Sequence, residues 1–347
     1  MARSRAVAPA VCLGIVMAAA HAARADPVED YYRGKSVNLV VSSAVGGGHD
    51  ILARAVAKFL PRHIPGNPQI VARNVPGAGG LIAANNLYNV AARDGLTIAQ
   101  FQNTLPFEPV FGNREATFDP TKFLWLGTQA TETAILVVWK NTPVASVDDI
   151  KNREITVGTA GVTSMSTFNS RVLAETLGMK LKIIPGYPGQ AEVFLAMEKG
   201  EVDSFPSYYS SLMGARPDWV ANRDVRIIVQ FGPEPEAAIP EVPFAGDLVT
   251  DPAKKLLLRA ATAPQALGRP FLMPPGTPDI YVAAMRKAFA ETFRDPEYLA
   301  EAKKLALTIN RPSSGEELQK VIEEVWRMPE DARAQLRRLS GNQQARE

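Results

Sequence analysis

The sequence is short of the residues that most metal and nucleophile chemistry requires. Cys12 is the only cysteine among 347 residues, and only three histidines are present. Cys12 lies in a stretch that we interpret below as a signal, so the mature chain would have no thiol. This excludes cysteine nucleophiles, disulfides, cysteine-ligated zinc and iron–sulfur clusters. Beyond residue 25 only His49 and His63 remain, and metal sites usually need three or four convergent ligands. We therefore expect no metal site.

Long apolar runs are absent after residue 25. The first 25 residues combine Arg3 and Arg5 with the apolar stretch AVAPAVCLGIVMAAA and with small residues at Ala23 and Ala25. This composition is typical of a cleavable secretory signal, and the stretch is short for a spanning helix, which needs about 20 apolar residues. A lipid anchor on Cys12 would require the apolar segment before the cysteine, and here most of it follows. We expect residues 1–25 to be a signal peptide.

No excess of one charge is present either. The chain has 38 basic and 36 acidic residues, and three of the basic ones fall in the expected signal, which leaves 35 and a net charge of −1. Because no run of lysine or arginine occurs, we expect no nucleic-acid partner. A hydrophobic content of 46% is typical of a globular protein, and the length suffices for two domains.

What is present is an alternation of short apolar runs with amphipathic stretches, which predicts an α/β fold with largely parallel sheets in two successive units. Prolines are frequent from Pro233 onward, and three further helices are expected at 279–293, 296–307 and 315–328. The expected strands span residues 36–43, 68–75, 94–103, 133–140, 154–160, 180–187, 201–207 and 225–232.

The stretch AVGGGHD, residues 44–50, joins an expected strand to an expected helix. Glycines allow close backbone approach, and the first N–H groups of a helix favour an anion. A plain turn capped by Asp50 explains the stretch equally well. It is neither a P-loop nor a dinucleotide loop, because no Lys-Ser/Thr follows and the G-x-G-x-x-G spacing is missing.

A second glycine loop, PGAGG at residues 76–80, also follows a strand and opens a helix. Ligands of open α/β sheets bind at the carboxyl edge, so two such loops in one unit favour an anion site. In the second unit, the hydroxyls of Thr163, Ser164 and Ser166 suit either a ligand or a helix cap. Asp203 is expected to end a strand, where it would orient backbone, bind an amine or cap a turn.

From about Tyr31 to about Trp326, the sequence resembles the receptors of tripartite tricarboxylate transporters, also called Bug receptors. The resemblance rests on six motifs in this order: GGGHDILAR, NVPGAGGLIAANNLY, DGLTI, VGTAGVTSMST, IPGYPGQAEVFLAMEKGEVD and PPGTPD. The resemblance implies a bilobal periplasmic-binding-protein fold of type II, a Venus flytrap with two α/β lobes around a ligand cleft. We expect residues 26–126 with 233–347 to form lobe 1 and residues 127–232 to form lobe 2.

The resemblance also implies a function. Such a receptor is a periplasmic monomer that captures a small organic carboxylate without catalysis or cofactor. It then delivers the ligand to the large and small membrane subunits of a secondary transporter. Carried onto this sequence, the implied ligand-binding residues are Val45, Gly46, Gly47, Gly48, His49, Asp50, Pro76, Gly77, Ala78, Gly79, Gly80, Gln102, Asn103, Thr104, Thr131, Thr163, Ser164, Met165, Ser166, Tyr187, Pro188, Gly189 and Asp203.

The chain departs from the usual pattern of that family near the first glycines. Val45 stands where proline is common, and His49 stands where threonine is common. Two alternatives stay open. One is a secreted α/β enzyme acting on a small organic acid, with His49 and Asp203 as acid–base groups, for which His49→Ala would abolish turnover. The other is a sensory receptor, which adjacent genes for membrane subunits would argue against.

Overall fold

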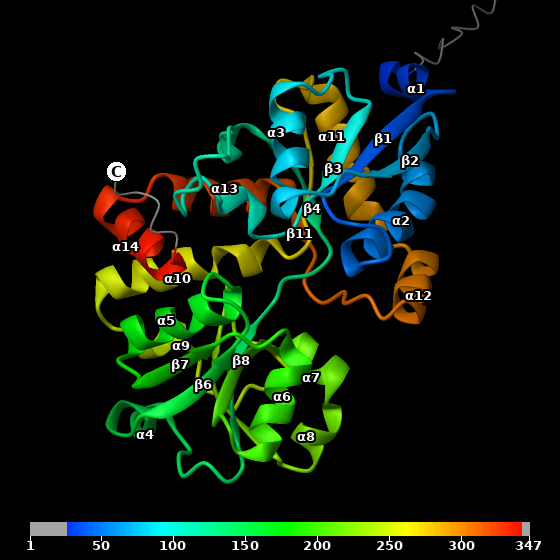
Figure 1. Ribbon diagram of the computed structural model, residues 1–347. Helices are drawn as coiled ribbons and strands as arrows, with labels where there is room; N and C mark the ends of the chain where they lie inside the picture. Colours follow the sequence, from blue (N-terminus) through cyan, green and yellow to red (C-terminus); the bar gives the residue numbers. More distant parts are fainter. Residues whose placement is uncertain (1–25, 342–347) are drawn as a thin grey trace, which may run out of the picture.

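The structure is a computed structural model that describes residues 26–341, so the expected signal at residues 1–25 lies outside the described residues. The chain forms two lobes, each with a sheet and helices packed on it (Figure 1). The first sheet contains β1 (Ser36–Val41), β2 (Gln69–Asn74), β3 (Thr97–Gln100), β4 (Leu124–Thr128), β10 (Phe271–Met273) and β11 (Ser313–Ser314). The second contains β5 (Ala134–Trp139), β6 (Ile155–Thr159), β7 (Leu181–Pro185), β8 (Ser204–Tyr208) and β9 (Val225–Phe231).

Helices cover both sheets. The first lobe uses α1 (Pro27–Tyr32), α2 (Gly48–Phe59), α3 (Leu81–Asn89), α11 (Asp279–Thr292), α12 (Pro296–Lys304) and α13 (Gly315–Trp326), with 3₁₀ turns η1 (Leu60–His63), η2 (Ala78–Gly80), η3 (Leu105–Phe107) and η4 (Pro120–Lys122). The remaining helices are α4 (Val147–Asn152), α5 (Met165–Leu177), α6 (Gln190–Lys199), α7 (Tyr209–Ala215), α8 (Pro217–Ala221), α9 (Ala245–Leu248), α10 (Pro252–Leu267) and α14 (Glu330–Ser340). Between residues 26 and 341, none of these helices has both the length and the apolar character needed to cross a membrane.

Both sheets are mixed, where the sequence predicted largely parallel ones. In the first sheet β2, β1 and β3 run parallel, but β10 lies antiparallel between β3 and β4. In the second sheet β6 is parallel to β7 and β8, whereas β5 is antiparallel to both β8 and β9. The chain enters β5 and β10 on crossing between the lobes, a step that the local strand pattern does not reveal, and the short β11 is also antiparallel to its neighbour β4.

Strand β5 shows how the sequence divides the core. Its apolar residues are buried on both sides, and they alternate between two hydrophobic clusters: Leu136 packs with α5 and α10, while Val137 packs with α6 and α8. The cluster that contains Leu136 continues into the first lobe through Phe111, whose ring contacts Phe168 of α5 at 5.5 Å between centroids. The lobes are therefore joined by packed side chains along one side.

Two crossover segments connect the sheets. The first runs from β4 to β5, and the second runs from α10 into β10. They are bonded to each other, since Glu132 N–H donates to Gln265 O at 3.0 Å and Arg269 N–H donates to Thr128 Oγ1 at 3.1 Å. Helix α10 packs against both α5 of the second lobe and α13 of the first. Packing therefore does not assign α10 to one lobe, and the expected lobe boundaries at 126/127 and 232/233 stay a prediction.

Candidate ligand cleft

Three strands of the first lobe end side by side at the edge that faces the second lobe. The parallel register places Val41 of β1 opposite Asn74 of β2 and Gln100 of β3. The segments that follow are the two glycine loops and residues 102–104. The structure thus brings together the expected first cradle at one sheet edge.

Both glycine loops open helices that no side chain caps. The N-cap residue of α2 is Gly47, and that of α3 is Gly80. Gly80 has a φ of 98°, and an added Cβ would lie 3.0 Å from Leu105 Cδ2 and 3.2 Å from Ser42 Cβ. Position 80 therefore requires glycine, both for its backbone conformation and because a side chain would have no room. The N–H groups in the first turn of α2 are left for solvent or for a ligand, whereas the first N–H of α3, that of Leu81, donates to Ala78 O.

Asp50 holds the first glycine loop in place through hydrogen bonds of its buried carboxylate. It is 2% exposed, and its carboxylate accepts bonds from Gly46 N–H, Arg54 Nε and Asn74 Nδ2, each at 2.9 Å. Burial alone would raise the pKa of Asp50, but these donors outweigh burial and lower it. The residue does not occupy the N-cap expected from the sequence, since it reaches back from the first turn instead. Both oxygens of the Asp50 carboxylate thus accept hydrogen bonds from protein groups.

Buried polar atoms with no partner lie at the same edge. Within residues 26–341, Ser42 Oγ, Ser43 Oγ and Gln100 Oε1 are buried and make no hydrogen bond. Ser42 and Gln100 are fully inaccessible. Buried polar groups normally find a partner, so these atoms indicate a place for ordered water or a ligand group.

His49 is held in one tautomer. Gln100 Nε2 donates to Phe101 O at 2.6 Å and also lies 2.9 Å from His49 Nδ1. The carbonyl oxygen of Phe101 can only accept, so the group of Gln100 that faces it must be the amide nitrogen. The same nitrogen donates its second N–H to His49 Nδ1, which therefore carries no proton. Burial and the charge of Arg269 lower the pKa of His49 to about 4, despite the bond from Gln100. The ring is neutral at pH 7 and carries its proton on Nε2.

In the second lobe, the hydroxyls expected near the ligand bond mainly to one another. Ser164 Oγ caps α5 by accepting from Thr167 N–H, and Ser166 Oγ accepts from Ala160 N–H. Ser164 and Ser166 also share a bond at 2.9 Å. The helix-cap interpretation of Ser164 is therefore confirmed. Thr163 is exposed beside this network.

Tyr187, Pro188 and Gly189 follow β7 and lead into α6, whose N-cap is Gly189 without a capping side chain. The ring of Tyr187 is half-buried, with Cε2 3.4 Å from the position of a Cβ on Gly158. This loop thus presents a third uncapped helix start, at the carboxyl end of the second sheet.

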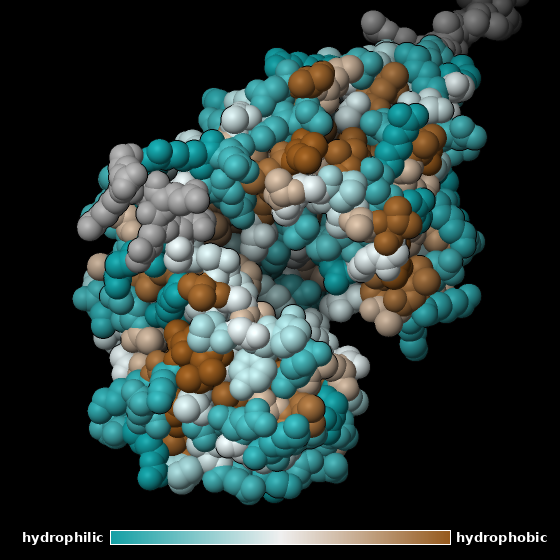
Figure 2. All heavy atoms as spheres, in the orientation of Figure 1, coloured by the Kyte–Doolittle hydropathy of each residue, from teal (hydrophilic) through white to brown (hydrophobic). Residues whose placement is uncertain are grey.

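The two carboxyl edges meet across the cleft. The side chain of Asn103, after β3, bonds to Tyr208 at the end of β8, and burial raises the pKa of Tyr208 to about 12. A cavity of about 110 Å³ is lined by Thr104 from the first lobe and by Thr163 and Met165 from the second. Figure 2 shows the molecular surface hollowed between the lobes, with mostly hydrophilic residues around the hollow.

Two expected residues lie differently. Asp203 comes before β8 rather than at a strand end, and its carboxylate accepts from Thr156 N–H at 2.8 Å and from Thr142 Oγ1 at 3.2 Å. Thr156 is at the start of β6, so Asp203 lies at the edge opposite to the loop after Thr159 and is not brought to His49. Thr131 lies in the first crossover, where Asn310 bonds to both its N–H and its C=O.

Two charged residues of the crossovers were not predicted. Arg269 Nη1 donates to Gly48 O at 3.0 Å, which places its guanidinium against the first glycine loop. Glu132, on the other crossover, accepts a bond from Ser210 Oγ of α7 at 2.6 Å. No local motif marks either residue, because a single arginine or glutamate between elements carries no periodic signal.

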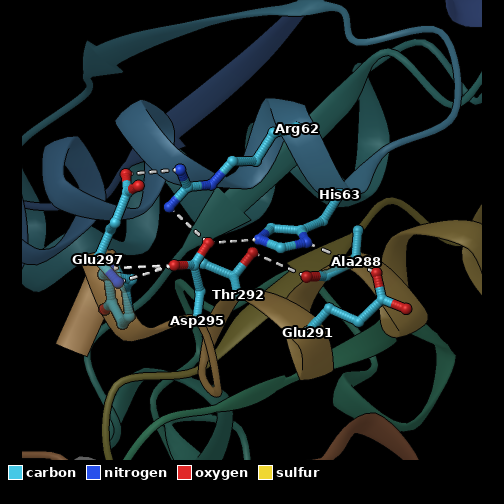
Figure 3. Close-up of polar contacts among 8 residues, drawn as sticks. Arg62, His63, Ala288, Glu291, Thr292, Asp295 and Glu297 are labelled. Carbon is cyan, nitrogen blue, oxygen red and sulfur yellow. Dashed lines mark hydrogen bonds and ion pairs between the residues drawn. The ribbon is translucent and has the colours of Figure 1, made fainter.

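The second histidine serves the scaffold. Figure 3 shows Arg62 and His63 of η1 pointing to Asp295 ahead of α12, with His63 Nε2 2.8 Å from Asp295 Oδ2. Asp295 also caps α12 by accepting from Glu297 N–H. In the described part of the chain, no group of three or more His, Cys, Asp and Glu side chains is arranged to hold a metal ion.

This arrangement, two mixed α/β lobes with glycine-opened helices at facing sheet edges, is the fold of a periplasmic binding protein. A solute-binding protein of the TctC type from Polaromonas, solved without ligand, matches it with a TM-score of 0.71 at 18% identity, over 90% of this chain and 99% of that one. MatC from Rhodopseudomonas palustris, solved with bound malate, matches with a TM-score of 0.56 at 20% identity, over 88% and 99%.

The sequence identifies the family. Residues 52–330 match the family described as the tripartite tricarboxylate transporter family receptor, and the chain belongs to that family. A curated relative, the "UPF0065 protein in the TAR-I ttuE-ttuC' intergenic region" of Agrobacterium vitis, is 27% identical over 183 residues. This match covers 50% of the chain and 51% of the relative, so the chain spans about half the length of that protein. The resemblance stated from the sequence is confirmed.

Proposed function

We propose that this solute-binding protein captures a small organic carboxylate between its lobes and delivers it to the large and small membrane subunits of a secondary transporter. The observation that carries the proposal is the sheet edge at β1 and β3. There, the start of α2 has no side-chain cap, and the hydroxyl of Ser42, which follows β1, has no hydrogen-bond partner among the described residues. Oriented N–H groups and hydroxyls hold an anion at lower desolvation cost than a fully buried ion pair.

Family membership and the composition of residues 1–25 support the rest of the proposal. The receptor works in the periplasm, reaches it through a signal peptide at residues 1–25, acts as a monomer and performs no catalysis. The carboxylate-bound relative MatC supports the ligand class. Ligand binding favours a closed arrangement of the lobes because contacts from both lobes form only there. The enzyme alternative loses its acid–base pair, because Asp203 is bonded within the second lobe away from His49.

A thermal-shift screen tests the proposal. The mature protein is unfolded and refolded to remove any bound solute. It is then melted with mono-, di- and tricarboxylates, aromatic acids and amides. A ligand that binds only the folded state raises the melting temperature, by an amount that grows with ligand concentration. We expect at least one small organic acid to do so. No shift with any acid would contradict the proposal.

A further inference from the structure

The two crossovers are in direct backbone contact, and each carries a charged side chain. Gly268 lies so close to Ala130 that an added Cβ would be 1.8 Å from the carbonyl oxygen of Ala130. The backbone bonds of Glu132 to Gln265 and of Arg269 to Thr128 flank this contact. Arg269 and Glu132 are thereby held on adjacent segments that bridge the lobes, and both line one cavity of about 10 Å³.

Arg269 has no carboxylate partner. Across residues 26–341, no acidic oxygen lies within 4 Å of its guanidinium. Its one side-chain bond is to Gly48 O, in the first turn of α2. Its charge is close enough to lower the pKa of His49 on one side and of Glu132 on the other. By contrast, Arg311, which follows the Asn310 that bonds to Thr131 of the first crossover, pairs with Glu234 at 3.0 Å.

Glu132 is a carboxylate in a poorly solvated position. Burial raises its pKa, and the bond from Ser210 and the charge of Arg269 offset this only in part. Among the described residues, the only hydrogen bond to its carboxylate is from Ser210, so one oxygen can still accept a donor. Since Ser210 belongs to the second lobe, Glu132 lies where both lobes meet.

We propose that Arg269 anchors the carboxylate of the ligand, and that Glu132 selects acids that carry a hydroxyl or ammonium group beside that carboxylate. This inference rests on the proposed function. The guanidinium of Arg269 lies against the first turn of α2, where its Nη1 bonds to Gly48 O, so its remaining N–H groups adjoin those of that turn. One anionic group satisfies these donors. Glu132 repels a second carboxylate and accepts a hydrogen bond from a donor.

The wild-type protein tests the selectivity. Calorimetric titrations compare malate, aspartate and succinate, and then lactate, alanine and propionate, because each set differs only in a hydroxyl, ammonium or hydrogen beside the carboxylate. We expect malate or aspartate to bind at least about 10-fold tighter than succinate, or lactate or alanine to bind correspondingly tighter than propionate. Equal affinities within both sets would overturn the role of Glu132. No binding in either set would overturn the inference, and the wider acid screen decides the proposed function separately.

Variants test each residue on the acid that binds tightest. Arg269→Gln is expected to weaken binding about 100-fold and Arg269→Lys less, whereas the matched control Arg311→Gln leaves affinity unchanged. Glu132→Gln should weaken an ammonium ligand about 100-fold but a hydroxyl ligand only about 10-fold, since the amide oxygen still accepts. Melting temperatures of ligand-free variants check folding. Equal affinity of Arg269→Gln and Arg311→Gln would overturn the anchor.

Discussion

Gly268 packs against the carbonyl of Ala130, with no room for a side chain between the two crossovers. An added Cβ would lie 1.8 Å from the carbonyl oxygen and 3.0 Å from Thr128 Oγ1. The residue also has a φ of 55°, which favours glycine. The crossing point of the two segments therefore depends on this one residue.

Gly268→Ala should destabilise the protein by more than about 3 kcal/mol, because the backbone must separate to admit the methyl group. Gly200→Ala is the matched control, since Gly200 has a φ of 76° but nothing within 4 Å of an added Cβ. Its cost should stay near the conformational penalty of about 1 kcal/mol. Urea unfolding measures both. Equal losses would mean that the close contact contributes nothing.

Acid should unfold the protein partly through His49. The ring has a folded pKa of about 4 against an ordinary 6.5, so between these values the unfolded chain binds a proton that the folded chain does not. Stability is therefore lost as the pH falls from about 6.5 to about 4. His49→Gln should reduce this loss by about 1 to 3 kcal/mol, measured as unfolding free energy at pH 7 and pH 4.5. An unchanged difference between the two pH values would contradict the lowered pKa of His49.

Asp50 should matter for both loop and ligand. Asp50→Asn removes the charge that holds Gly46 N–H and Arg54. We expect a loss of about 1 to 3 kcal/mol and weaker acid binding, because the first glycine loop is no longer fixed. Asp148→Asn is the control, since Asp148 is 80% exposed and pairs only with Lys151 nearby. Wild-type affinity in Asp50→Asn would show that the loop needs no such support.

The alternation of apolar runs predicted most strands correctly, but several helices were missed, of which α10 and α14 are the longest. Helix α10 contains Pro264, and a proline inside a helical pattern argues against a helix, whereas Pro252 at its first position is compatible with one. Pro264 lies in the last turn, and the buried Leu257, Leu258 and Ala261 pack α10 between the lobes. Tertiary packing therefore outweighs the local preference, which a sequence pattern does not report.

The candidate site was predictable only where it is local in the chain. The glycine loops at residues 44–50 and 76–80 combine a strand, glycines and a helix within a few residues, and the structure places both at one edge. Arg269 and Glu132 meet only because the crossovers lie together, so nothing in either neighbourhood marks them. Asp203 was expected at a strand end, but β8 begins one residue later, which puts it at the opposite edge.

The cluster around His63 should stabilise the first lobe. Asp295 is 9% exposed and joins Arg62, His63 and the start of α12 (Figure 3). Asp295→Asn should cost about 1 to 3 kcal/mol in urea unfolding while acid binding stays unchanged. Glu297→Gln is the control, because Glu297 contacts the same Arg62 but is 74% exposed. Similar effects of the two substitutions would mean that burial of Asp295 adds nothing.

The central claim is that the cleft binds a carboxylate through its charge. Its most direct test is a calorimetric titration of the refolded protein with the tightest-binding acid and with the amide of the same acid, which has the same shape without the charge. The account predicts saturable binding of the acid and affinity at least about 100-fold weaker for the amide. Equal binding of acid and amide would contradict it.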